Sequence, residues 1–270
     1  MTQVYAEVIG DPIAHSKSPV IHNFWLKHLE IDAEYRAHHV RPEELAAYFA
    51  ARRADPAWRG CNITLPHKQA ALDHVGDPGG VRESIGAINL AARDERGDLF
   101  GTNTDAGGFF APISGMDMAG AHVGLIGAGG AARAVLFALS RLEVGRVTIF
   151  NRTPLKAAGL LAQFGLKGDA VPLDAPVPPV DLLVNASALG MAGQAPLDID
   201  LAPLPDEAIV YDIVYAPLET DLLSRAHARG LETVDGLEML IGQAAIAFEI
   251  LFDTAPPRDL DETLREKLTG

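Results

Sequence analysis

The sequence predicts an α/β protein with mostly parallel sheets, divided into two domains. Short runs of β-branched residues alternate with helical patterns along most of the chain, and this order is typical of strands joined through helices that lie on the sheet. The chain has 270 residues and is 48% hydrophobic, so it can bury the cores of two domains. A glycine-rich turn near the middle separates an apolar strand from an alanine-rich helix, which predicts a doubly wound sheet in the second domain.

In the N-terminal part of the chain, strands alternate with short helices. Ser18 is expected to cap a helix that has Pro19 in its first turn, because both residue types favour a helix start. A second helix is expected over Pro42–Arg53, and a short one would carry His67 and Lys68. The expected strands are Val4–Ile9, Tyr35–Val40, Gly60–Leu65, Ala87–Ala92 and Leu99–Gly101.

From His122 onward the pattern becomes strand, glycine turn, helix and strand, which makes one βαβ unit. Its helix spans Ala131–Leu142, and a later helix over Thr220–Arg229 ends at Gly230. A last helix begins after Gly236 and repeats apolar residues at helical spacing, so it packs against a large surface. The expected strands are His122–Ile126, Val147–Phe150, Leu182–Asn185, Ile209–Val214 and Thr233–Val234.

The composition argues against several classes of partner. The formal net charge is −14 and the isoelectric point is about 5.0, whereas nucleic acids and anionic membranes attract stripes of Lys and Arg. Cys61 is the single cysteine of the sequence, so no internal disulfide is expected and the thiol should be buried. No run approaches the ~20 apolar residues of a membrane span. We therefore expect a cytoplasmic protein that binds neither nucleic acid nor membrane.

The glycine-rich turn is a candidate dinucleotide site. Gly127 permits a tight turn, Gly129 lets backbone amides approach a pyrophosphate, and Ala132 is small enough for close packing of helix on strand. The N-terminus of the following helix adds N–H donors and a partial positive charge. A tight structural turn that binds nothing is the alternative. The full turn comprises Gly127, Ala128, Gly129, Gly130 and Ala131.

The residues after the next strand favour NADP over NAD. An NAD site has an acidic residue about 20 positions after the glycines, where it binds the ribose 2′-hydroxyl. Here the strand runs instead into Asn151, Arg152 and Thr153, with Lys156 close behind. Arg152 is able to grip a 2′-phosphate through paired donors while Lys156 adds positive charge. A solvated basic turn is the alternative, and we predict NADP as the cofactor.

Polar residues of the N-terminal domain form a second candidate site. Asn62 and Thr64 share one face of their strand, opposite Cys61 and Ile63. That face is either ordinary solvent exposure or a binding surface. Five other polar residues also have an ordinary explanation when each is considered alone. Ser16 and Ser18 could be a loop residue and a helix cap, Lys68 a surface lysine, Asn89 a strand-end residue and Asp105 a helix cap.

Together these residues resemble the shikimate dehydrogenase family, and the resemblance covers nearly the whole chain in the same order. The run Gly10–Pro19 resembles the opening motif of the family, and Asn62–Lys68 is similar to its Asn-x-Thr-x-Pro-x-Lys segment. Further matches lie at Gly86–Asn89, Asn103–Asp105, Asn151–Thr153, Asn185–Ser187, Tyr211–Tyr215 and Asp235–Leu237, with Gln243 beyond.

The resemblance implies roles for individual residues. Lys68 and Asp105 would be the catalytic pair that handles the proton of the reacting hydroxyl, with Lys68 as the proton carrier. The substrate would contact Ser16, Ser18, Asn62, Thr64, Lys68, Asn89, Asp105, Tyr215 and Gln243. NADP would contact Gly127, Ala128, Gly129, Gly130, Ala131, Asn151, Arg152, Thr153, Lys156, Ser187, Ile213 and Gly236.

The resemblance also implies the architecture and the reaction. A discontinuous α/β substrate domain, residues 1–104 and 237–270, would hold an inserted Rossmann-type NADP domain, residues 105–236, with the site in the cleft between them. The implied reaction is the reversible reduction of 3-dehydroshikimate to shikimate by NADPH, a step of aromatic amino-acid and chorismate biosynthesis. Quinate or a related hydroxy acid is the alternative substrate, and a non-catalytic NADP-binding sensor is the alternative from another class. Both a monomer and a homodimer are compatible with the sequence.

Two positions depart from the family pattern. Leu90 stands where the family has a threonine after the asparagine of Gly-Ala-x-Asn, so a hydrogen-bonding side chain is lost there. Glu238 occupies the second glycine position of the Asp-Gly-Leu-Gly stretch, which changes either the nicotinamide-side loop or only the surface. The histidines show no metal-binding spacing and no Gly-x-Ser-x-Gly turn occurs, so neither a metal site nor a serine hydrolase is expected.

Overall fold

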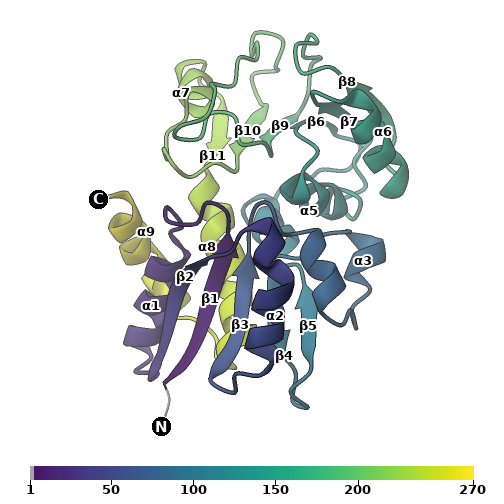
Figure 1. Cartoon of the computed structure of the whole chain (residues 1–270). Coiled ribbons are helices and arrows are strands. Elements are labelled where there is room, and N and C mark those ends of the chain that lie inside the picture. The colour runs from purple at the N-terminus through teal and green to yellow at the C-terminus, as the bar shows by residue number, and fades with distance from the viewer. Residues whose placement is uncertain (1–2) are drawn as a thin grey trace. The chain divides into compact units, whose positions relative to one another are not determined.

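The computed structural model describes residues 3–270, and the chain divides into two compact units (Figure 1). The first unit consists of the residues up to Thr104 together with Ile241–Gly270, and the second consists of Asp105–Leu240. The second boundary therefore lies at 240/241 rather than at the expected 236/237. The reason is that helix α8 (Gly236–Phe252) begins in the second unit, where Met239 belongs to the hydrophobic core.

The first unit contains a five-stranded sheet in the order β2-β1-β3-β4-β5. β1 pairs in parallel with β2 and β3, whereas β4 is antiparallel to both of its neighbours. A tight turn joins β4 to β5, and in it the Asp94 carboxylate accepts hydrogen bonds from the backbone N–H groups of Arg96 and Asp98. Such a turn can join only antiparallel strands. The strands are β1 (Val4–Gly10), β2 (Ala33–His39), β3 (Trp58–Ile63), β4 (Leu90–Arg93) and β5 (Leu99–Thr102).

Helices cover both faces of this sheet. A Cβ placed on Gly60 of β3 would collide with Leu251 of α8, so α8 packs closely on one face. Glu7 lies beside Cys61 on the other face, where its carboxylate accepts a hydrogen bond from the Tyr48 hydroxyl of α2 at 2.8 Å. Figure 1 shows α2 on the near side of the sheet and α8 behind it. The other helices of this unit are α1 (Ser18–His28), α3 (Val81–Ser84) and α9 (Asp261–Thr269), and α2 spans Leu45–Arg53.

Short 3-10 helices complete the first unit, at Pro42–Glu44, Ala70–His74 and Arg258–Leu260. Two local expectations are corrected. Ser18 is the first residue of α1 rather than its cap, because the cap position is Lys17. His67 and Lys68 lie in a turn rather than in a helix, because the His67 imidazole bonds the Val40 carbonyl at 2.6 Å and ties the turn to the end of β2.

The second unit contains six parallel strands in the order β11-β10-β9-β6-β7-β8. From β6 the chain winds outward to β8 on one side and then from β9 to β11 on the other, which is the strand order of the Rossmann fold. The expected doubly wound sheet is therefore confirmed. Its strands are β6 (His122–Ile126), β7 (Arg146–Phe150), β8 (Gly168–Val171), β9 (Leu182–Asn185), β10 (Ile209–Asp212) and β11 (Glu232–Val234).

The sheet of the second unit is buried on both faces. Val184 of β9 belongs to the core beneath α5 and α6, whereas its neighbour Leu183 belongs to the core that includes Leu222 and Leu223 of α7. Adjacent residues thus enter opposite cores, as strand geometry requires. The helices are α4 (Asp105–Phe110), α5 (Gly130–Leu139), α6 (Pro154–Gln163), α7 (Asp221–Ala228) and the start of α8, with a 3-10 helix at Ala111–Ile113.

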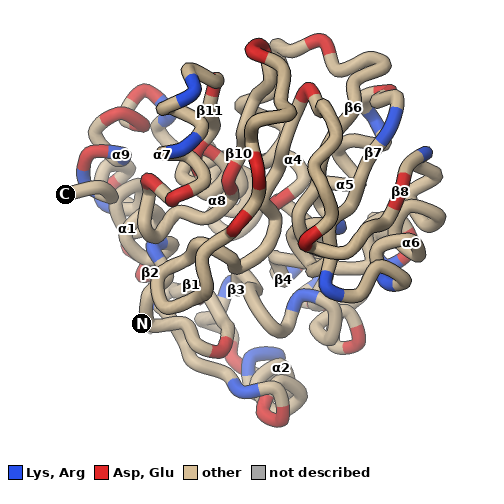
Figure 2. The backbone as a smooth tube through the Cα atoms, turned by 90° about the horizontal axis from the view of Figure 1, so that it is seen from above, with Lys and Arg blue, Asp and Glu red and all other residues tan. Residues whose placement is uncertain are grey.

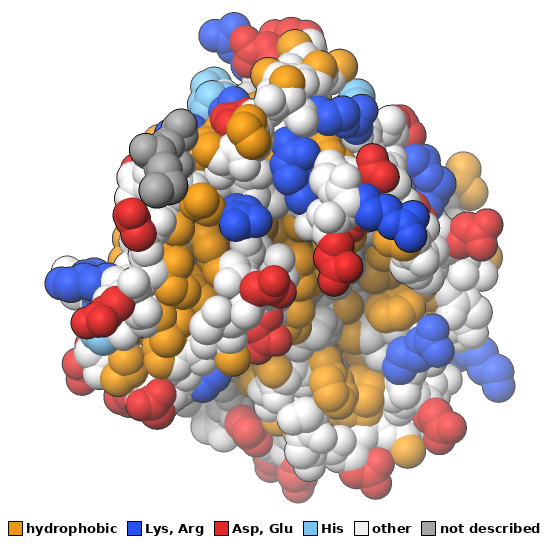
Figure 3. Space-filling view, turned by 90° about the horizontal axis from the view of Figure 1, so that it is seen from below, with side chains coloured by type: hydrophobic (Ala, Val, Ile, Leu, Met, Phe, Trp, Pro, Cys, Tyr) orange, Lys and Arg blue, Asp and Glu red, His pale blue; other side chains and the backbone are white. Residues whose placement is uncertain are grey.

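Charged residues are dispersed over the chain. Figure 2 shows acidic positions on loops and helix ends of both units, and the Lys and Arg positions form no continuous stripe along the described backbone. On the face drawn in Figure 3, basic side chains are interspersed with acidic ones beside a band of hydrophobic side chains. Among residues 3–270, no helix combines the length and apolar character needed to cross a bilayer.

Candidate active site

Asn62 lies at the centre of a buried polar cluster in the first unit. It is 5% exposed on β3, so ordinary solvent exposure, one of the two interpretations left open for this face, does not apply to Asn62. Its Oδ1 accepts a hydrogen bond from the Tyr35 hydroxyl at 2.7 Å, and its Nδ2 donates to the Asn89 carbonyl at 3.4 Å. Helices on both faces of β3 explain the burial, and strand alternation alone could not reveal them.

Asn89, Thr104 and Gln243 form the second part of this cluster. The Asn89 Nδ2 donates to Thr104 Oγ1 at 2.8 Å and to Gln243 Oε1 at 3.2 Å, while the Asn89 Oδ1 accepts the Thr104 N–H at 2.6 Å. The three side chains are buried. Gln243 is 154 positions from Asn89 in the chain, so helix α8 brings it to a site built by the N-terminal sheet. Two of the predicted substrate residues, Asn89 and Gln243, are thus in contact.

Ser16, Thr64 and Lys68 lie in the loops after β1 and β3, and Ser18 is the first residue of α1, which follows the first of these loops. A Cβ on Gly10 would lie 2.5 Å from the Thr64 methyl group, so only glycine allows these two loops to approach so closely. The Ser16 Oγ accepts a hydrogen bond from the Ser18 N–H at 3.3 Å. The Lys68 carbonyl accepts one at 2.8 Å from the N–H of Ile88, the residue before Asn89. The predicted substrate residues of the first unit therefore lie around the carboxyl ends of β1 and β3.

In the second unit, the glycine turn follows β6 as predicted. Gly127 has φ +107°, and a Cβ there would lie 2.9 Å from the Ala186 carbonyl oxygen, so this position requires glycine. A Cβ on Gly129 would meet nothing within 4 Å, so the protein itself does not require glycine there. The open space over this backbone, at the start of α5, fits the close approach of a pyrophosphate. Ala132 is fully buried against the sheet.

The loop after β7 presents the predicted cationic pair. Asn151 shapes this loop, because its side chain donates to the Thr153 carbonyl at 2.9 Å. Arg152 and Lys156 are exposed, and within residues 3–270 neither forms an ion pair or side-chain hydrogen bond. By contrast Arg146, at the start of the same strand, pairs with the Asp169 carboxylate. Arg152 and Lys156 are therefore available to bind an anion.

The Asp212 carboxylate, at the end of β10, forms hydrogen bonds that connect the carboxyl ends of β9 and β10, a role that was not predicted from the sequence. This buried carboxylate accepts hydrogen bonds from Asn185 Nδ2 at 2.9 Å, the Val214 N–H at 3.0 Å and the Thr220 hydroxyl at 2.7 Å. Burial raises the pKa of Asp212, and the three hydrogen bonds oppose that rise. In turn Asn185 Oδ1 accepts from the Ser187 hydroxyl at 2.7 Å.

Several predicted cofactor residues meet at these strand ends. The Ile213 N–H donates to the Asn185 carbonyl at 3.1 Å. A Cβ on Gly236 would lie 2.5 Å from the Ile213 carbonyl oxygen, so glycine is needed where α8 starts. Ser187 lies against Gly127, because a Cβ on that glycine would be 3.3 Å from the Ser187 Cβ. The carboxyl ends of β6 and β9 lie at the switch point of the strand order, where open α/β sheets bind their ligands.

The predicted catalytic pair is divided between the units. Lys68 is half-buried in the first unit, and Asp105 is 5% exposed as the first residue of α4 in the second. Tyr215 also belongs to the second unit, and burial raises the pKa of its hydroxyl. The pairing of Lys68 with Asp105 stays a prediction. In the described part of the chain, no group of His, Cys, Asp or Glu side chains is arranged to hold a metal ion.

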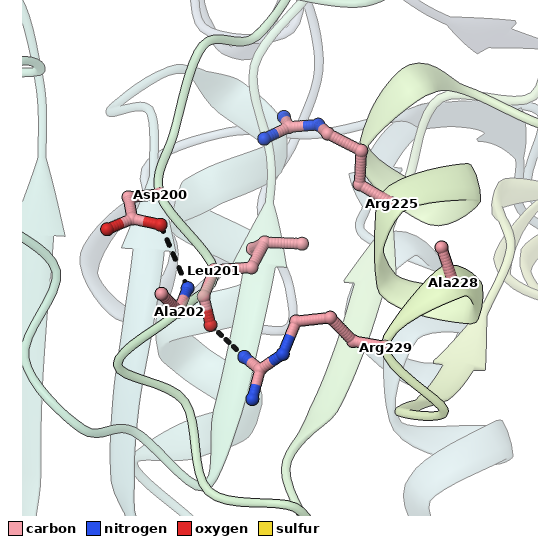
Figure 4. A pocket seen from close by; sticks show the side chains of 6 residues that line it. All are labelled: Asp200, Leu201, Ala202, Arg225, Ala228 and Arg229. Carbon is pink, nitrogen blue, oxygen red and sulfur yellow. Dashed lines mark hydrogen bonds between the residues drawn. The ribbon is translucent and has the colours of Figure 1, made fainter.

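An open pocket of about 440 Å³ in the second unit contains none of the predicted residues (Figure 4). Its two arginines are Arg225 of α7 and Arg229, the residue that follows this helix. Both donate to backbone carbonyls of the 197–204 loop. Arg225 also pairs with Asp221 at 2.7 Å. Both guanidinium groups therefore anchor the 197–204 loop to this end of the second unit through its backbone carbonyls.

Comparison with known proteins agrees with this arrangement. Family models match three parts of the chain: the shikimate dehydrogenase substrate binding domain at residues 8–91, shikimate/quinate 5-dehydrogenase at 111–186, and the shikimate 5′-dehydrogenase C-terminal domain at 236–262. Shikimate dehydrogenase (NADP(+)) of Sphingopyxis alaskensis is 64% identical over 98% of this chain and 97% of its own length.

Two solved structures are similar over almost the whole chain. Shikimate 5-dehydrogenase of Thermus thermophilus, in complex with NADP(H) and shikimate, has a TM-score of 0.87 at 37% identity, covering 98% of this chain and 99% of that one. Quinate dehydrogenase of Corynebacterium glutamicum, in complex with NAD, has a TM-score of 0.87 at 27% identity, covering 98% of this chain and 99% of that one. These matches lead to one assignment, which the glycine turn and the buried polar cluster had suggested: the chain belongs to the shikimate dehydrogenase family.

Proposed function

We propose that this protein catalyses the NADP-dependent, reversible oxidation of shikimate to 3-dehydroshikimate. The observation that carries the proposal is the 64% identity, over nearly the full length, to a shikimate dehydrogenase (NADP(+)). The buried polar cluster around Asn62 and Asn89 suits a small, hydroxylated acid, because each side chain there has a defined hydrogen-bonding partner.

Each unit has its own part in the proposed reaction. Ser16 and Ser18 bind the substrate carboxylate, and Asn62, Thr64, Asn89 and Gln243 hold ring hydroxyls. Lys68 Nζ takes the proton of the reacting hydroxyl during oxidation and returns it during reduction, while the Asp105 carboxylate orients that hydroxyl together with Lys68. Tyr215 completes the substrate contacts.

NADP supplies the hydride acceptor for oxidation and, when reduced, the hydride donor for the reverse reaction. The residues of the second unit fit this cofactor. The open backbone at Gly129 leaves room for the pyrophosphate, and the unengaged Arg152 and Lys156 provide charge for the ribose 2′-phosphate. Ala128, Gly130 and Ala131 complete the pyrophosphate turn. Asn151 and Thr153 shape the phosphate loop, while Ser187, Ile213 and Gly236 form the nicotinamide side.

A panel of two acids and two cofactors tests this proposal. We expect the highest kcat/KM for shikimate with NADP, lower values for quinate with NADP, and weak use of NAD with either acid. A clear preference for quinate with NAD would contradict both the substrate and the cofactor.

Quinate remains the alternative substrate because of Leu90. This residue is fully buried and lies directly across from Asn62 in the sheet, where the family pattern has a threonine. The missing hydroxyl alters the surroundings of a proposed substrate residue and is the specific reason to include quinate in the panel. Glu238, the other departure from the family pattern, gives no reason to expect a different substrate. It is exposed in the first turn of α8, where an acidic side chain is favourable.

A non-catalytic NADP sensor is the alternative from another class. Such a sensor would need the glycine turn and Arg152, but it would need neither Lys68 nor the buried polar cluster around Asn62 and Asn89. Binding of NADPH without its oxidation by any cyclic keto acid would favour the sensor. We also propose that the protein acts in the cytoplasm, because its one cysteine is buried and unpaired, and that it is a monomer or a homodimer.

A further inference from the structure

Tyr35 of β2 forms a buried hydrogen bond to Asn62 that no sequence motif indicates. The Tyr35 hydroxyl donates to Asn62 Oδ1 at 2.7 Å, and the tyrosine is 1% exposed. Burial raises the pKa of this hydroxyl well above its usual value of 10.0, so it stays protonated and remains a donor. Because the Asn89 carbonyl can only accept, the Asn62 Nδ2 must face it, and this bond together with the Tyr35 hydrogen bond to Oδ1 determines the orientation of the Asn62 amide.

Helix α1 holds Tyr35 in place from two sides. The ring of His22 stacks on the Tyr35 ring with a centroid distance of 4.0 Å and an interplanar angle of 4°. Burial lowers the pKa of His22 to about 3, so the stacked imidazole is neutral. The Asn23 side chain accepts the Tyr35 N–H at 2.9 Å and donates to the Tyr35 carbonyl at 2.6 Å. Because α1 begins at Ser18, one helix connects this clamp to a proposed substrate residue.

The cross-strand neighbour of Asn62, Leu90, cannot supply a hydrogen bond to it. Residues paired directly across antiparallel strands have Cβ atoms about 5 Å apart, and Leu90 is the partner of Asn62 in this register. A leucine there offers no hydrogen bond, so the donor to Asn62 Oδ1 comes from β2 on the other side. With Oδ1 bonded to Tyr35 and one Nδ2 hydrogen directed to the Asn89 carbonyl, the second Nδ2 hydrogen is left to donate.

We infer that Tyr35 is a positioning residue that orients Asn62 so that its Nδ2 donates to an oxygen of the substrate. This inference rests on the proposed function, in which Asn62 contacts a ring hydroxyl. It extends that function by assigning recognition of this oxygen to a buried tyrosine that does not itself touch the substrate. In this chain Tyr35 makes a hydrogen bond to Asn62 that the cross-strand neighbour Leu90 cannot make.

The test is Tyr35→Phe, which keeps the stacking on His22 and removes only the hydroxyl. We expect KM for shikimate to rise about tenfold, because the Asn62 amide loses its fixed orientation, while KM for NADP stays unchanged. Tyr48→Phe is the matched control, since it removes a buried tyrosine hydroxyl bonded to Glu7 on the opposite face of the sheet. Tyr48→Phe should lower the unfolding midpoint about as much as Tyr35→Phe does, but it should leave KM for shikimate and KM for NADP as in the wild type.

Two further variants separate positioning from general damage. Adding Leu90→Thr to Tyr35→Phe places a hydroxyl next to Asn62 and should restore most of the lost affinity for shikimate. In an Asn62→Ala background, Tyr35→Phe should have no additional effect on KM, because Tyr35 acts through Asn62. An unchanged KM for shikimate in Tyr35→Phe would overturn the inference while leaving the proposed function intact. Absence of shikimate oxidation by the wild type would overturn the proposed function, and the inference with it.

Discussion

Arg52 Nε donates to Glu7 Oε2 at 2.7 Å, although the Glu7 side chain has no exposed surface. Tyr48 and Arg36 donate to the same carboxylate at 2.8 and 3.1 Å. Burial alone would raise the pKa of Glu7, but the hydrogen bonds from Arg52, Tyr48 and Arg36 outweigh it and hold this pKa below 4.5. This cluster therefore connects β1, β2 and α2 on one face of the sheet of the first unit.

Glu7→Gln should lower the free energy of unfolding at neutral pH by about 3 kcal/mol, because it breaks a buried ion pair. Since the folded-state pKa of Glu7 is depressed, its contribution is present above pH 4.5 and is lost as the pH falls further. The difference between wild type and variant should shrink below that pH. Denaturant unfolding across the acid range measures this. Glu44→Gln, which removes an exposed pair with Arg41, should cost less than about 1 kcal/mol.

Arg152→Asp should raise KM for NADP by about 10²-fold and change KM for NAD little, because a carboxylate repels the 2′-phosphate that only NADP carries. Steady-state kinetics with both cofactors measure the effect. Arg146→Asp is the control, since Arg146 lies at the opposite end of the same strand and pairs with Asp169. Equal effects of Arg152→Asp on the two cofactors would refute the phosphate clamp.

The two glycines of the turn should respond differently to alanine. Gly129→Ala should leave the unfolding midpoint near that of the wild type, because its Cβ meets no protein atom, but should weaken NADP binding about tenfold or more by occupying space needed by the pyrophosphate. Gly127→Ala should instead lower stability by about 1–3 kcal/mol, owing to its positive φ and the clash with Ala186. Thermal unfolding and cofactor titration distinguish the two. Normal NADP binding by Gly129→Ala would place the pyrophosphate elsewhere.

Lys68→Met should reduce turnover about 10²-fold or more and leave NADP binding nearly intact, because it removes the proton carrier and not a cofactor contact. Lys27→Met, at the exposed end of α1 in the same unit, is the control and should keep normal kinetics. Near-normal turnover by Lys68→Met would exclude the proposed role of this lysine.

The longer helices and strands and the glycine turn could be predicted from the sequence, because each depends on residues that are close together in the chain. β6 and β9 have the expected bounds, and the glycine turn connects β6 to α5. The shorter elements β8 and α9 were not predicted, because four residues of mixed polarity and a polar terminal helix carry little periodic pattern. Helix α6 was not predicted either, although Thr153 at its N-cap and Pro154 as its first residue form a helix-start pattern that could have been used.

The buried polar network could not be predicted, because its partners are far apart in the chain. Asn62 is bonded to Tyr35, 27 positions away, and Asn89 to Gln243, 154 positions away. A strand pattern identifies a polar face but does not show whether a helix covers that face. Resemblance to a family named Asn62, Asn89 and Gln243, yet it did not point to Tyr35 or Asp212, which hold neighbouring residues in place.

The most direct measurement is the formation of NADPH when the purified protein is given shikimate and NADP. We predict steady turnover on the order of 1–10³ s⁻¹ at saturation, the range of ordinary enzymes, with 3-dehydroshikimate as the product. Tight binding of NADPH accompanied by no turnover of shikimate, in either direction, would contradict the proposed function.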